Sequence, residues 1–64
     1  MDEIFYNDFT IEELKGFLQK EQQHVMIYGA LGNIALQGYH LKEAHKIEAI
    51  IKNKEYIQAL KEQD

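Results

Sequence analysis

Residues 28–44 constrain the fold of this chain more than any other part of its sequence. They combine helix-forming residues with a Gly-containing turn, a pattern typical of two helices folded back on each other. Gly29, Gly32 and Ala35 would form a strip of small residues on the first helix, where a neighbouring helix could approach closely. The stretch therefore predicts a packing module and not a reaction centre.

The size of the chain limits what it can bury. A domain of 64 residues buries only ~60% of its unfolded surface and usually needs further support. The chain has no Cys, which excludes disulfides and thiolate zinc sites, and no Pro, which favours uninterrupted helices. We therefore predict a single all-α domain that is supported by association.

The clearest local signal is a capping box at Thr10-Ile-Glu-Glu13. The Thr10 hydroxyl and the Glu13 carboxylate can each accept a hydrogen bond from the other residue's backbone amide. Phe9 and Leu14 occupy the two positions of a hydrophobic staple around it. The sequence thus predicts that a long helix begins just after Thr10.

The expected fold is an antiparallel helical hairpin with a short N-terminal arm. The first helix is predicted over 10–37, with a break near Gly29 as the alternative, and the turn over 38–40, with Gly38 as the helix C′ residue. The second helix is predicted over 41–62, and Lys52-Asn-Lys54 leaves open a break near Asn53. Residues 1–9 mix acidic and aromatic types, which predicts a segment folded over an edge of the core or, alternatively, a contact arm for a partner.

The apolar residues exceed what two helices can cover. In the second helix they occupy more than one side, so the first helix can shield only part of them. We therefore expect a homodimer or a helical protein partner, and no stable isolated monomer. The residues predicted to interact are Tyr28, Gly29, Gly32, Ala35, Ile47, Ile50, Ile51, Ile57 and Leu60.

Part of the chain resembles a tetratricopeptide (TPR) repeat. Leu31-Gly-Asn33 and Glu43-Ala44 match its Leu-Gly pair and the Ala that faces it, and Tyr28 stands at its aromatic position; Ala35 replaces its usual Tyr. With Lys42-Glu-Ala-His-Lys-Ile47, the segment is similar to the opening hairpin of TPR-like co-chaperones of type III secretion needle subunits. The resemblance covers about half the chain and implies a role in holding another helical protein.

Few residues suggest chemistry. Glu21 and His24 form an E-x-x-H pair on one helix face, as in di-iron carboxylate bundles, where a second hairpin would have to add ligands such as Glu48. Long polar side chains surround the pair, and His40 and His45 do not have the helical spacing of a zinc motif. The chain has no Ser, no Cys and no phosphate-binding loop, so we expect no metal, no cofactor and no enzyme activity.

The charge pattern narrows the class of partner. The net charge is −4 and every basic residue is Lys, which argues against nucleic acid and against an anionic membrane surface. The N-terminal sequence lacks the pattern of a signal peptide, so the expected location is the cytoplasm. The alternative to an interaction module is an acidic inhibitor or regulator, such as a phage-derived one, that occupies a basic surface of its target.

Overall fold

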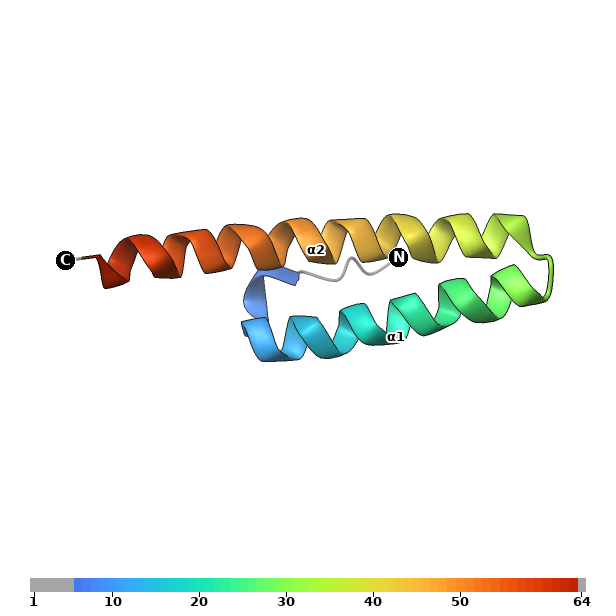
Figure 1. The fold of residues 1–64 in the computed structure, drawn as a ribbon, viewed down its shortest axis with the longest axis horizontal. Helices are drawn as coiled ribbons and strands as arrows, with labels where there is room; N and C mark the ends of the chain where they lie inside the picture. Colours follow the sequence, from blue (N-terminus) through green and yellow to red (C-terminus); the bar gives the residue numbers. More distant parts are fainter. Residues whose placement is uncertain (1–5, 64) are drawn as a thin grey trace.

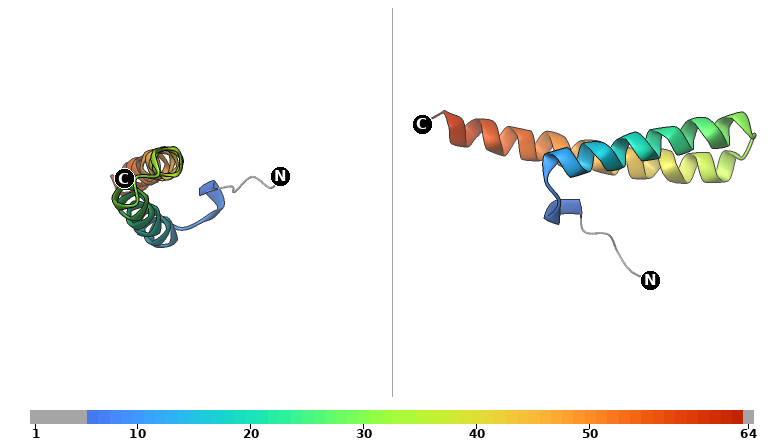
Figure 2. Two further views of the ribbon diagram at one scale, coloured as in Figure 1. Left: turned by 90° about the vertical axis from the view of Figure 1, so that its right-hand side faces the viewer. Right: turned by 90° about the horizontal axis from the view of Figure 1, so that it is seen from below.

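The computed structural model describes residues 6–63, which form two long helices packed side by side in antiparallel directions (Figure 1). The 3₁₀ helix η1 covers Tyr6–Asp8, α1 covers Ile11–Ala30 and α2 covers Ile34–Glu62. Viewed along the hairpin, η1 lies to one side of the two helices (Figure 2). The predicted fold class, an all-α hairpin with a short N-terminal arm, is confirmed.

The capping box starts α1 at the predicted residue. The Glu13 amide donates to Thr10 Oγ1 at 3.1 Å, and the Thr10 amide donates to Glu13 Oε1 at 2.9 Å. Thr10 has extended backbone angles, so the chain enters the helix at Ile11. Phe9, the outer residue of the predicted staple, packs against the core that contains Leu14.

The turn lies at residues 31–33, so the prediction of a turn over 38–40 was wrong. Gly32 has φ +75°, and the amides of Gly32 and Asn33 donate to the carbonyls of Gly29 and Tyr28 at 3.1 and 2.9 Å. These two bonds form a Schellman motif, the usual helix ending with a glycine at C′. Asn33 Oδ1 then accepts from the Leu36 amide at 3.1 Å and caps α2. The pair Gly32-Asn33 thus ends one helix and starts the next, whereas Gly38 is a residue inside α2.

The helix boundaries change accordingly. The first helix ends at Ala30 and not at residue 37, as the alternative of a break near Gly29 had anticipated, and the second begins at Ile34 and not at residue 41. It continues through Asn53 to Glu62, so the break considered there does not occur. A single Asn inside a helix costs less than ~1 kcal/mol, which its helix-forming neighbours easily offset.

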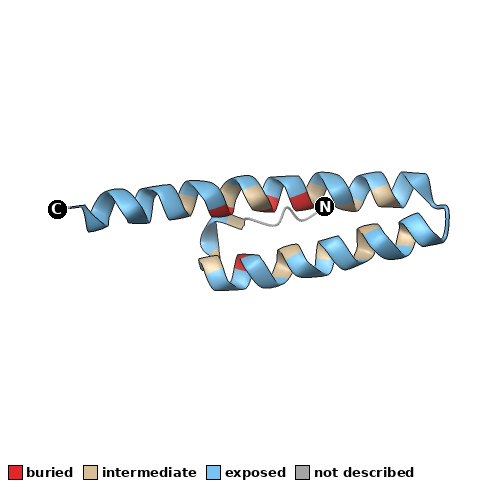
Figure 3. Ribbon diagram, viewed as in Figure 1, coloured by how far each residue is buried: buried red, intermediate tan, exposed pale blue. Residues whose placement is uncertain are grey.

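The core is small and lies where α1 begins, beneath the middle of α2 (Figure 3). Among residues 6–63, the buried side chains are Leu14, Ala44, Ile47 and Ile51. The N-terminal arm completes this core, since Phe9 packs edge-on against Phe17 with ring centroids 4.9 Å apart. Lys54 Nζ also donates to the Asn7 carbonyl at 2.8 Å. The described part of the arm therefore folds over the core edge, as predicted; Ile4 and Phe5 lie outside the described residues.

Candidate functional site

Large apolar side chains lie exposed along the hairpin, and most of them are near its two ends. One group surrounds the turn, and we call it the tip patch: Met26 (74% exposed), Ile27, Leu31 and Ile34 (81%). The other, the C-terminal patch, consists of Tyr56, Ile57 and Leu60 on the last turns of α2. Scattered apolar residues are normal on protein surfaces, but grouped ones mark sites of contact with other molecules.

The C-terminal patch is exposed because α2 extends beyond α1 (Figure 1). The turn is centred on Gly32, so the start of α1 at Ile11 lies opposite about residue 53 of α2. Residues after Glu55 therefore lie past the start of α1. Tyr56 and Leu60 are four residues apart and Ile57 and Leu60 three apart, so they share one side of the helix.

Between the two patches, the helices leave a shallow groove. Val25 and Met26 from α1 and Leu41 and Ala44 from α2 give an open hollow of about 350 Å³ its apolar walls. Grooves of this kind accept the apolar face of an amphipathic helix. Gln22, His45 and Glu48 line the same hollow, so its surface combines apolar walls with polar side chains.

The predicted small-residue strip on the first helix does not form. Gly32 is in the turn and Ala35 is in α2, and both are exposed. At Gly29, a Cβ atom would lie 2.5 Å from Nε2 of Gln37, whose side chain reaches the Val25 carbonyl at 3.4 Å. The close approach at Gly29 is therefore made inside the hairpin, with α2 of the same chain.

The predicted stripe on the second helix divides into an inner and an outer part. Ile47 and Ile51 are buried against Leu14, and Ile50 is half-buried beside them. Ile57 and Leu60 remain 43% and 47% exposed. Of the isoleucines and leucine predicted to interact, only these last two present a large part of their surface to a partner.

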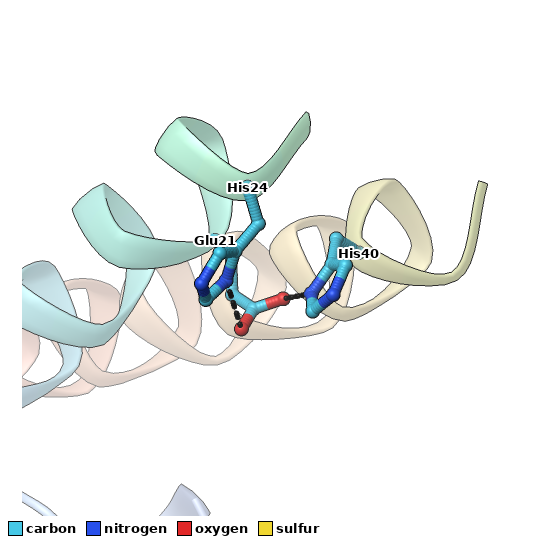
Figure 4. A group of neighbouring side chains, drawn as sticks. All are labelled: Glu21, His24 and His40. Carbon is cyan, nitrogen blue, oxygen red and sulfur yellow. Dashed lines mark hydrogen bonds and ion pairs between the residues drawn. The ribbon is translucent and has the colours of Figure 1, made fainter. Parts of the chain in front are cut away.

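The most notable polar group is Glu21, His24 and His40, which we call the His–Glu cluster (Figure 4). Glu21 and His24 come from α1 and His40 from α2. His40 Nδ1 lies 2.7 Å from Glu21 Oε2, and His24 Nδ1 lies 3.8 Å from Glu21 Oε1. Each imidazole thus directs its own Nδ1 atom to the Glu21 carboxylate.

Aromatic rings hold His40 in place. Tyr28, another residue of the predicted interaction set, stacks on it with centroids 5.3 Å apart and ring planes 7° apart. Tyr39 contacts the same ring edge-on at 5.1 Å. The His24 ring is also near, with its centroid 4.5 Å from that of His40. These neighbours restrict the rotation of the His40 ring, whose side chain is only 15% exposed.

Sequence reasoning found the Glu21–His24 pair but missed His40. The predicted turn at 38–40 placed His40 in a loop, far from Glu21 and His24. A turn centred on Gly32 instead places His40 opposite His24, because each of them lies eight residues from Gly32. The Gly32-Asn33 pair, which can end one helix and cap the next, was the signal that could have revealed this contact.

Tyr6 links the arm to α2 beside this cluster. Its hydroxyl donates to Glu43 Oε2 at 3.1 Å, and Lys46 Nζ donates to the other oxygen of the same carboxylate at 3.4 Å. Burial raises the pKa of Tyr6 to about 12, and the hydrogen bond to Glu43 and the negative charge of that carboxylate act in the same direction. The neutral hydroxyl of Tyr6 thus holds the arm against α2 through its hydrogen bond to Glu43.

Comparison with known proteins gives no information on the function of this chain. No protein-family model matches this chain, and no curated protein or solved structure is significantly similar to it. Within residues 6–63, neither helix carries an apolar stretch long enough to cross a bilayer.

Proposed function

We propose that this chain is a non-enzymatic helical interaction module, which packs its exposed apolar residues on a helix of another protein or of a second copy. The observation that carries the proposal is the imbalance between buried and exposed apolar side chains. The core of the described residues holds three large aliphatic side chains, Leu14, Ile47 and Ile51, while the tip and C-terminal patches expose seven large apolar ones.

The energy of burial explains why this imbalance favours association. A fully buried Leu, Ile or Met side chain contributes roughly 1.5–3 kcal/mol. Whole domains are stable by only ~5–15 kcal/mol, so several uncovered side chains are a large part of what the fold could gain. A partner that covers either patch would therefore stabilise the hairpin itself.

A helical partner suits the shape of the surface. The groove between α1 and α2 and the overhanging end of α2 both present apolar residues along helical directions. A second copy is the simplest such partner, because it supplies a helix with the same pattern and closes by two-fold symmetry. A helix of another protein would cover the same surfaces. The co-chaperone role implied by the TPR-like resemblance is one form of this function, although Leu31 and Gly32 lie in the turn and do not face Ala44 as in that repeat.

The C-terminal patch offers a matched pair of variants. Ile57→Asp places a charge within the patch, whereas Gln58→Asp places the same charge at the next residue, which is polar and exposed. Size-exclusion chromatography with light scattering should show that wild type and Gln58→Asp associate and that Ile57→Asp elutes with a lower mass. Equal masses for all three chains would remove the C-terminal patch from the interface.

A further inference from the structure

We infer that the His–Glu cluster binds a divalent transition-metal ion of the zinc class, which bridges α1 and α2. This inference is independent of the proposed interaction. Glu21, His24 and His40 supply one carboxylate and two imidazoles, and one ligand atom from each lies within 4.8 Å of the other two.

The donor set selects the class of ion. Imidazole nitrogens suit Zn²⁺ and its first-row neighbours, whereas Mg²⁺ and Ca²⁺ prefer oxygen ligands alone. Two His and one Glu are also the protein ligands of known open zinc sites, in which water takes the remaining position. The His24 side chain is 45% exposed, so solvent can reach that position.

The three ligand atoms, one from each residue, lie within 4.8 Å of one another and must move to tetrahedral spacing around an ion. A tetrahedral Zn²⁺ ion with bonds of about 2.0–2.2 Å holds its ligand atoms about 3.3–3.6 Å apart. His40 Nδ1 and Glu21 Oε2 are already closer than this, at 2.7 Å, and must separate slightly. His24 Nδ1 must approach from 3.8 Å, and its partial exposure leaves the ring room to do so.

An ion pair between Glu21 and His40 does not account for the whole cluster. His24 Nδ1 is buried within the described structure, yet it has no hydrogen-bond partner there. A buried ring nitrogen without a partner has lost its hydrogen bond to water and has gained none within the protein. A metal ion would coordinate His24 Nδ1. It would also take the place of the hydrogen bond between Glu21 and His40.

Aromatic neighbours orient the ligand from α2. Metal-binding imidazoles are usually held in one orientation by a hydrogen bond from the second ring nitrogen, and at His40 the packing of aromatic rings restricts the orientation instead. Here Tyr28 stacks on His40 and Tyr39 contacts its edge, so the ligand from α2 is already oriented toward the two from α1. Because the ion would join the two helices across the hairpin, binding would stabilise the fold by mass action.

Titration of the full chain with Zn²⁺ tests the site. Calorimetry should show one tight ion per chain, and the temperature of unfolding should rise with Zn²⁺. His24→Asn, His40→Asn and Glu21→Gln should each weaken binding by more than the roughly 10–100-fold that loss of a supporting group costs. His45→Asn is the matched control, because it removes an exposed imidazole from α2 outside the cluster, and its affinity should equal that of wild type.

A measurement on the wild-type chain covers the case in which a ligand variant fails to fold. In nuclear magnetic resonance spectra of the imidazole nitrogens, Zn²⁺ should shift the signals of His24 and His40 and leave those of His45 in place. Absence of stoichiometric binding would overturn the inference. So would an equal loss of affinity in His45→Asn, or shifts spread over all three imidazoles, since either result would mean unspecific binding to surface histidines.

Discussion

At the scale of single residues, Gly32 fixes where the chain reverses. Its φ of +75° is a conformation in which a side chain is strained, although nothing lies within 4 Å of where a Cβ would be. Gly38 also has free space around its Cβ position, but it lies inside α2. The backbone at Gly32 therefore requires glycine, whereas the backbone at Gly38 does not. Substitution by Ala at each position tests this difference.

We predict that Gly32→Ala lowers the free energy of unfolding by about 1–2 kcal/mol, because Ala must adopt the left-handed conformation. Gly38→Ala should raise it by about 0.5–1 kcal/mol, because Ala loses less backbone entropy than Gly inside a helix. Urea denaturation followed by circular dichroism measures both. If Gly38→Ala proves the destabilising change and Gly32→Ala the harmless one, the turn has been placed wrongly.

The difficulty of choosing between these glycines explains most of what the sequence did not predict. Gly29, Gly32 and Gly38 all interrupt a helical pattern with similar propensities, and the apolar spacing continues through each of them. The choice depends on the Asn33 cap and on which turn lets the two apolar faces meet. The second condition is tertiary and lies beyond local patterns.

At the scale of elements, the N-terminal arm is held to α2 by a hydrogen bond whose strength depends on a proton. Tyr6 donates from its neutral hydroxyl to Glu43. Its pKa is raised from 10.0 to about 12 in the folded chain. Stability that comes from a raised pKa is fully present below the unfolded value and is lost as pH rises through the folded one. The window for Tyr6 therefore lies between pH 10.0 and about 12.

We predict that wild type loses more stability than Tyr6→Phe between pH 8 and pH 11, because the Tyr6 hydroxyl, which Phe lacks, ionises more easily in the unfolded chain. Thermal unfolding of both chains across this range measures the difference. Tyr56→Phe is the matched control, since it removes a hydroxyl from a side chain that is 63% exposed. Parallel losses in wild type and Tyr6→Phe would show that the arm is not held by this bond.

The elements differ in how far the sequence specifies them. The start of α1 was predictable because all members of the capping box lie within four residues. The apolar excess of α2 was also visible, but not which residues face inward: Ile47 and Ile51 are buried, whereas Ile57 is not. That distinction follows from where α1 begins relative to α2. The contact of His40 with Glu21 depends in the same way on the register between the helices.

At the scale of the whole molecule, two helices and a short arm make a thin structure. Within residues 6–63, α1 and α2 pack on each other, and η1 lies to one side of them (Figure 2). The arm packs on the core near the start of α1. The turn end and the last turns of α2 keep large apolar side chains exposed. Such a hairpin gains most by adding further helices to its sides, as helical bundles do. The proposed metal ion binds the His–Glu cluster, whereas the proposed partner covers the groove and the two apolar patches.

Sedimentation equilibrium of the unmodified chain, over loading concentrations from low micromolar to high micromolar, tests the proposed interaction most directly. We predict an average mass that rises with concentration toward a multiple of 7.5 kDa, together with a temperature of unfolding that rises in parallel. The reason is that association covers the tip and C-terminal patches. A mass of one chain at every concentration, with a high and constant temperature of unfolding, would contradict the account, because the hairpin and its arm would then be stable without any partner.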